Sequence, residues 1–229
     1  MAGDSDAEKT EDASPRRLEK AREDGDVPRS KELATFAVLM TAGAGLWATG
    51  GNLAGHLSSM LASSLSLTRE QIYNPTVLIE RIANDIGGVL LACLPLALAI
   101  MLVALAAPMA IGGFNFTSKA FMPNFGKLNP ISGLGNIFSA NALVELLKAV
   151  VKTVLVGCVA YIVVMSEKEA VLGLAVEPLG AGTGHVADLI AHAFLFIVGS
   201  LGVVALIDAP YQMWHYSNKL KMTRQEMIQ

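Results

Sequence analysis

The chain has 229 residues, of which 53% are hydrophobic and only 16% charged, and its mean hydropathy is +0.49. Soluble domains usually carry nearer a quarter of charged residues, so this composition argues against an ordinary soluble domain and favours a membrane protein. The formal net charge of -3 at pH 7 indicates no strong global field, so charge alone does not identify a partner.

Residues 1–32 are predicted to form a cytoplasmic tail that contains a short helix. The first residues are acidic and turn-prone, which is typical of a mobile tail. Ser14 is the predicted N-cap of the helix, Pro15 its first residue and Gly25 its stop. The first apolar run begins only at Leu33, so the start of the chain is unlike a signal peptide.

The apolar runs predict an all-α membrane protein with four transmembrane helices. The predicted spans are 33–53, 86–112, 142–165 and 186–212, because a hydrocarbon core takes about 20 residues of helix to cross. We expect two helical hairpins, joined by an apolar cytoplasmic loop over residues 113–141. The membrane domain then covers residues 33–214, and residues 215–229 begin a cytoplasmic linker. Whether the spans form a compact bundle or wrap around a partner stays open.

The distribution of Lys and Arg predicts that both termini lie in the cytoplasm. The segment before Leu33 has seven such residues, the loop 113–141 has two and the segment after Trp214 has three. The other two connections together have three. Twelve against three fixes the orientation, because Lys and Arg are enriched in cytoplasmic segments.

The remaining two basic residues, Lys148 and Lys152, lie inside the third span, close to Glu145. From a helix start near Ala142, Lys148 is roughly 9 Å and Lys152 roughly 15 Å along the helix. Asp208 reaches a depth similar to that of Lys148 if the third and fourth spans are antiparallel. We expect Asp208 to pair with Lys148, with Lys152 as a second candidate partner, and Glu145 to help neutralise this intramembrane charge cluster. Either the cluster stabilises the helix pair, or Lys152 faces a watery path or a partner subunit.

The loop 113–141 is unusually apolar for a cytoplasmic connection. Its Phe, Leu and Ile residues recur at helical or near-helical spacing and are interrupted by Pro and Gly. Such a segment is expected to lie against the lipid interface or against another protein.

No catalytic or ligand-binding motif is found. The chain lacks HExxH, GxxxxGK[ST] and GxSxG, its histidines are scattered, and its two cysteines fall in apolar stretches. We therefore predict no enzyme, no metal site and no cofactor. Acidic neighbours reduce the basic segment 16–31 to about +2, so a nucleic-acid partner is not expected. A small four-span solute or ion transporter that uses the intramembrane Lys and Asp residues stays open as an alternative.

Three phrases of the sequence, in order around the four spans, resemble the membrane part of the FlhB/SctU family of flagellar and secretion-system type III export switch proteins. They are "EKTEDASPRRLEKAREDGDVPRSKEL" at the start, "KLNPISGLGNIFS" before the third span and "IDAPYQMWHYSNKLKMTRQE" at the end. The resemblance covers essentially the whole chain.

The resemblance implies a multi-pass protein of the bacterial inner membrane that takes part in flagellar type III protein export. It implies that the loop 113–141 meets the export gate and helps to control its cytoplasmic entrance. The implied partners are the gate subunits FliP, FliQ and FliR, the protein FlhA, exported flagellar proteins and the lipid bilayer. The expected gate contacts are five residues of this loop: Phe121, Phe125, Leu128, Pro130 and Phe138.

The sequence departs from the family in one respect. Family members continue into a soluble domain that cleaves itself between Asn and Pro of an Asn-Pro-Thr-His motif, whereas this sequence ends at Gln229. Its own Asn74-Pro75-Thr76 is followed by Val77 and is expected on the opposite side of the membrane. We therefore expect the C-terminal self-cleaving domain to be absent from this chain.

Overall fold

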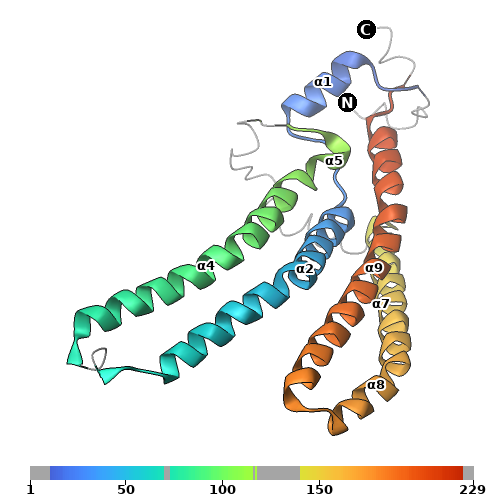
Figure 1. Ribbon diagram of the computed structural model, residues 1–229. Helices are drawn as coiled ribbons and strands as arrows, with labels where there is room; N and C mark the ends of the chain where they lie inside the picture. The colour runs from blue at the N-terminus through green and yellow to red at the C-terminus, as the bar shows by residue number, and fades with distance from the viewer. Residues whose placement is uncertain (1–10, 70–72, 116, 118–139, 224–229) are drawn as a thin grey trace, which may run out of the picture. The chain divides into compact units, whose positions relative to one another are not determined.

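The structure is a computed structural model that describes residues 11–69, 73–115, 117 and 140–223. Four long helices dominate these residues (Figure 1): α2 (Lys31–Leu65), α4 (Pro75–Ala106), α7 (Ala140–Ser166) and α9 (Leu179–Leu220). The shorter elements are α1 (Pro15–Glu23), α5 (Met109–Gly112), α8 (Lys168–Gly173) and the 3-10 turn η3 (Leu174–Val176). All four long helices are apolar and long enough to cross a membrane, which confirms the predicted all-α membrane fold.

The surfaces of the long helices are apolar. Leu91 of α4 is 69% exposed and Leu206 of α9 is 74% exposed, and many other large apolar side chains are similarly open. Apolar surface in water costs about 25 cal/mol per Å². Few apolar residues are buried among the described ones: Val163, Val198, Ala205, Leu220 and Met222. The chain therefore has a surface suited to lipid, and its helix pairs are held by a few specific contacts.

The helices differ in extent from the predicted spans. α2 continues to Leu65, well past the predicted end at residue 53, and α4 begins at Pro75, well before residue 86. The predicted span 86–112 is divided, because α4 ends at Ala106 and Pro108 precedes the separate helix α5. Proline lacks the N–H that a continuing helix needs and clashes with the preceding turn.

The described helices contribute to two compact units. The first unit comprises residues 1–35, 106–158 and 200–229, and the second comprises residues 36–105 and 159–199. α2, α7 and α9 each begin in one unit and end in the other.

In the second unit, α2 packs closely against α4 and α9 at two glycines. A Cβ atom at Gly45 would lie 2.5 Å from Cδ1 of Leu96 in α4, and one at Gly43 would lie 2.5 Å from the ring of Phe194 in α9. These positions bring the backbone of α2 against its neighbours because glycine has no side chain.

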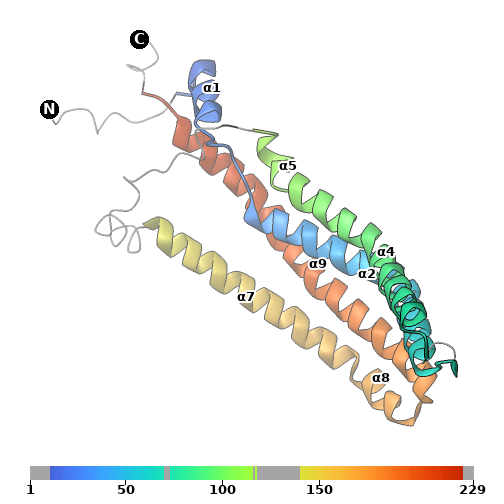
Figure 2. The same ribbon diagram turned by 90° about the vertical axis from the view of Figure 1, so that its left-hand side faces the viewer.

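The helices α2 and α4 are antiparallel. Ser63, near the end of α2, accepts a 2.6 Å hydrogen bond at its backbone oxygen from Nη2 of Arg81, near the start of α4. The hydroxyl of Ser63 also donates to Asp85 at 3.3 Å. Farther back along α2, Gly45 meets the later residue Leu96, so the two helices run in opposite directions. At the far end of α7, the short helix α8 turns the chain towards the start of α9 (Figure 2).

In the first unit, α1 has the predicted terminal residues. The hydroxyl of Ser14 accepts a hydrogen bond from the backbone N–H of Arg17 at 3.4 Å, and Pro15 is the first helical residue. After the helix ends, Gly25 adopts a φ of 81°, a left-handed conformation that glycine reaches without steric cost.

Side chains from two other segments anchor the end of α1 and the residues after it. Asn115 donates to the backbone oxygen of Arg22 at 2.6 Å, and Thr117 donates to that of Glu23 at 2.7 Å. These two carbonyls belong to the last turn of α1, where helix carbonyls lack partners within the helix. Asp26 is bound to α9, because Lys219 donates to its carboxylate at 2.6 Å. The segment before α2, the residues after α5 and the end of α9 are thus joined.

Candidate functional site: a polar cluster in the first unit

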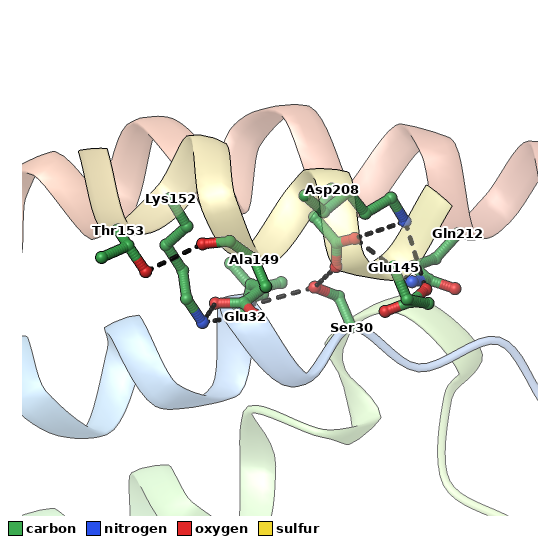
Figure 3. Close-up of polar contacts among 10 residues, drawn as sticks. Ser30, Glu32, Glu145, Ala149, Lys152, Thr153, Asp208 and Gln212 are labelled. Atoms are coloured by element: carbon green, nitrogen blue, oxygen red, sulfur yellow. Dashed lines mark hydrogen bonds and ion pairs between the residues drawn. The ribbon is translucent and has the colours of Figure 1, made fainter. Parts of the chain in front are cut away.

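Polar side chains from three helices meet in the first unit, in a region of otherwise apolar helices (Figure 3). We call this set the polar cluster. It consists of Ser30 and Glu32 at the start of α2, Glu145, Lys148 and Lys152 of α7, and Asp208, Tyr211 and Gln212 of α9.

Asp208 is the acceptor at the centre of the polar cluster and is only 8% exposed. Its Oδ2 accepts a 2.6 Å hydrogen bond from the hydroxyl of Ser30, and its Oδ1 accepts one of 3.2 Å from Nε2 of Gln212. Gln212 is four residues farther along α9, so helix geometry places it beside Asp208. Two neutral donors and a nearby ammonium together stabilise the buried carboxylate.

Ser30 connects two parts of the first unit and is 3% exposed. Besides donating to Asp208, its hydroxyl accepts a hydrogen bond from the backbone N–H of Leu33 at 3.1 Å. The second contact is an N-cap interaction at the start of α2. One hydroxyl therefore starts α2 and attaches it to α9.

Lys148 lies between two carboxylates and an aromatic ring. Its Nζ is 3.6 Å from Oδ1 of Asp208, 3.5 Å from Oε1 of Glu145 and 3.8 Å from the ring centroid of Tyr211. The expected ion pair between Lys148 and Asp208, with Glu145 beside it, is thus present. The Nζ atom is buried and has no hydrogen-bond partner among the described residues. It is held by charge attraction and by a cation–π contact.

Lys152 has a different partner from the one considered in the sequence analysis. Its Nζ contacts both carboxylate oxygens of Glu32, at 2.9 and 3.1 Å, and Figure 3 shows its side chain directed towards the start of α2. The proposal that Lys152 shares Asp208 is therefore corrected. α7 is joined to α9 through Lys148 and to α2 through Lys152.

A pocket of about 500 Å³ adjoins the polar cluster. Its lining combines the charged residues with apolar side chains of α7 and α9, and it includes Arg29 and Lys31 from the segment that leads into α2. No group of His, Cys, Asp and Glu suited to a metal ion occurs in the described part of the chain.

Ser30 and Glu32 were not predicted as members of the polar cluster. Ser30 is recognisable from its sequence as an N-cap candidate for α2, but its bond to Asp208 joins residues 178 positions apart. Glu32 precedes the first apolar run and looks like an exposed residue of the tail. No local pattern reveals either contact. The five expected gate-contact residues, Phe121, Phe125, Leu128, Pro130 and Phe138, lie outside the described residues.

Four apolar helices, three of which are attached to one another through the polar cluster, define a multi-pass membrane protein. The chain belongs to the FlhB HrpN YscU SpaS family, whose model matches residues 7–229. This membership confirms the resemblance seen in the sequence.

Relatives in several bacteria show the same kinship. The chain is 37% identical over 229 residues to the flagellar biosynthetic protein FlhB of Salmonella typhimurium, covering 99% of this chain and 59% of that protein. It is 29% identical to FlhB of Bacillus subtilis, covering 96% of this chain and 61% of that protein. It is 27% identical to the Yop proteins translocation protein U of Yersinia pestis, covering 96% of this chain and 62% of that protein.

The chain thus spans less than two thirds of the length of these relatives. Their names describe flagellar biosynthesis and protein translocation, and they specify no catalysed reaction. They do not support the alternative of a small four-span solute or ion transporter.

Proposed function

We propose that this chain is a membrane component of the bacterial flagellar type III protein export apparatus. The observation that carries the proposal is the family match over residues 7–229, together with the 37% identity to a flagellar FlhB. The four apolar helices fit a component of the inner membrane. Because the chain covers 59% of that relative, the proposal concerns the membrane part of the apparatus.

The proposed orientation places both termini and the loop 113–141 in the cytoplasm. The count of Lys and Arg supports this orientation. A further support is the set of contacts in the first unit, where Asn115 binds the last turn of α1 and Lys219 binds Asp26, which lies between α1 and α2. The N-terminal segment, the start of the loop and the end of α9 are then on one side of the membrane.

The proposed partners are the gate subunits FliP, FliQ and FliR, with FlhA and the exported flagellar proteins. In this proposal the apolar loop lies across the gate subunits at the cytoplasmic entrance and shifts as unfolded proteins pass. Its residues Phe121, Phe125, Leu128, Pro130 and Phe138 supply the contacts. An apolar segment that is interrupted by Pro and Gly is suited to packing across several neighbouring subunits.

In the same proposal the polar cluster has a structural role. The positions of α7, α9 and α2 are set by contacts among Lys148, Asp208 and Ser30. A buried polar group that loses its partner costs free energy, so these contacts hold the three helices in place. The loop between α4 and α7 is thereby attached to a defined helix at its far end.

The proposal is tested by purifying the tagged chain in mild detergent from a flagellated bacterium and quantifying the co-purifying membrane proteins by mass spectrometry. We expect FliP, FliQ and FliR at a fixed ratio to the chain. A matched control is the same chain with the segment 119–138 replaced by a Gly/Ser linker of equal length, which should insert into the membrane but recover less of the gate. A chain that purifies without any gate subunit contradicts the proposal.

A further inference from the structure

The pocket beside the polar cluster has an excess of positive charge. Four basic and three acidic side chains line it, which leaves a formal charge of +1: Arg29, Lys31, Lys148 and Lys152 against Glu32, Glu145 and Asp208. Lys152 is paired with Glu32, and Lys148 is shared by the other two carboxylates. Arg29 and Lys31 therefore carry two unpaired positive charges, while Lys148 with its two carboxylates has a net charge of -1.

Arg29 and Lys31 are exposed, and neither side chain forms an ion pair or a hydrogen bond with another described residue. They flank the buried Ser30, whose bonds to Asp208 and Leu33 fix the backbone between them. Two free cations are thus held at the pocket by an anchored residue. Guanidinium and ammonium groups are the side chains that proteins use most to bind phosphate oxygens.

Apolar side chains also line the pocket. Val151 and Leu155 of α7 face it together with Val203 and Ile207 of α9. Val151 is 56% exposed and Ile207 is 70% exposed, so both present apolar surface to the surroundings of the helices. A ligand that fits this lining carries an anionic group at one end and a hydrocarbon chain at the other.

We propose that this pocket binds one anionic phospholipid, with the phosphate on Arg29 and Lys31 and an acyl chain along α7 and α9. Free phosphate could bind the same two cations. It would leave the apolar lining of the pocket uncovered, whereas an acyl chain covers it. Lys148 also lines this pocket, and its Nζ makes no hydrogen bond with a described residue, so it can add a contact to a phosphate oxygen without losing a hydrogen bond. A zwitterionic lipid fits less well, since its own cation opposes the excess charge.

The test is native mass spectrometry of the full chain, delipidated in a neutral detergent and titrated with phosphatidylglycerol, phosphatidylcholine of the same acyl chains, or inorganic phosphate. We expect one phosphatidylglycerol to bind at least about fivefold tighter than phosphatidylcholine, because a basic residue near an anionic lipid contributes a factor of about five. The double variant R29Q/K31Q should weaken phosphatidylglycerol binding by at least the same factor. Its matched control is R16Q/K20Q, which removes two exposed charges from α1, outside the pocket.

A second variant, Lys148→Gln, should also weaken phosphatidylglycerol binding, and circular dichroism checks that its helices remain. If Lys148→Gln does not fold, R29Q/K31Q decides the matter by itself because both residues are exposed. Equal affinity for the two lipids overturns the proposal, as does an equal loss in R16Q/K20Q. Inorganic phosphate that binds as tightly as phosphatidylglycerol assigns the site to the free ion and also overturns it.

Discussion

The hydroxyl of Ser30 donates a 2.6 Å hydrogen bond to Asp208 while it accepts one of 3.1 Å from the backbone N–H of Leu33. Both side chains are buried, at 3% and 8% exposure. The bond joins the first residue before α2 to the second half of α9, and it leaves Asp208 able to face Lys148. The N-cap of α2 and the ion pair between Asp208 and Lys148 are therefore connected through Ser30.

Replacing Ser30 by Ala is expected to lower the stability of the chain. The variant loses an N-cap, which costs about 1 kcal/mol, and removes a donor from a buried carboxylate, which costs about 1–3 kcal/mol more. In detergent, the midpoint of thermal unfolding should fall by at least about 4 °C, measured by circular dichroism at a fixed scan rate. Ser64→Ala is the matched control, since that exposed hydroxyl of α2 bonds only to the backbone of its own helix. A midpoint for Ser30→Ala equal to that of Ser64→Ala contradicts this prediction.

The ion pair between Lys152 and Glu32 is expected to be coupled. In a double-mutant cycle with Glu32→Gln and Lys152→Gln, the coupling should be about 0.5–3 kcal/mol, since contacting partners of one ion pair are not additive. Both side chains are partly covered, at 29% and 37% exposure.

The control cycle uses Lys219 and Asp26, which are 57% and 42% exposed. This more solvated pair should give about 0.2–1 kcal/mol. Unfolding of the purified variants in one detergent supplies both cycles. If the coupling energy of the Lys152–Glu32 pair is no larger than that of the Lys219–Asp26 pair, partial burial does not strengthen the first ion pair, and the prediction is contradicted.

The sequence pattern predicted the helices of this fold more completely than the contacts of the polar cluster. Long uncharged runs predicted four apolar helices because their composition is read locally. The helices extend beyond the predicted spans: α2 continues past residue 53 and α4 begins before residue 86, because a helix can continue beyond the residues that cross the hydrocarbon core. Pro108 had been counted inside a span, yet α4 ends before it.

Within the polar cluster, depth along antiparallel helices was enough to pair Lys148 with Asp208. Lys152 lies on the same face of α7 as Lys148, because residues four apart are neighbours on a helix surface, so the helix pattern alone did not assign different partners to the two lysines. Lys152 lies four residues farther along α7, and it meets Glu32. Glu32 belongs to the start of α2, and no local sequence pattern shows that this segment lies beside α7.

Gly43 is predicted to tolerate no side chain. A Cβ at this position would lie 2.5 and 2.6 Å from two ring carbons of Phe194, so Gly43→Ala should destabilise the chain by about 1–3 kcal/mol. Gly50→Ala is the control in the same helix, because no atom of another described part of the chain lies within 4 Å of its Cβ position. The control should be neutral or slightly stabilising, since Ala is favoured over Gly in a helix by about 1 kcal/mol. Equal unfolding midpoints for the two variants conflict with the close approach of α2 and α9.

Three aromatic residues of the loop 113–141, Phe121, Phe125 and Phe138, are expected to be needed for export and not for insertion. Combined replacement of Phe121, Phe125 and Phe138 by Ala removes the apolar contacts proposed for the gate, while the four apolar helices that drive insertion are unchanged. Export is measured as secreted flagellar protein in a strain whose only copy of the protein carries these changes, and insertion as the amount in the membrane fraction.

We expect secretion to fall at least about tenfold, the effect of losing about 1.4 kcal/mol of gate contact, with an unchanged membrane fraction. Phe114→Ala is the matched control, because this aromatic side chain precedes the three and is 78% exposed. Its replacement should leave secretion near the level of the unchanged protein. Normal secretion by the triple variant contradicts the proposed contacts between these aromatic residues and the gate. An equal loss of secretion in Phe114→Ala shows that the effect is not specific to the three residues and reflects apolar surface after α5 in general.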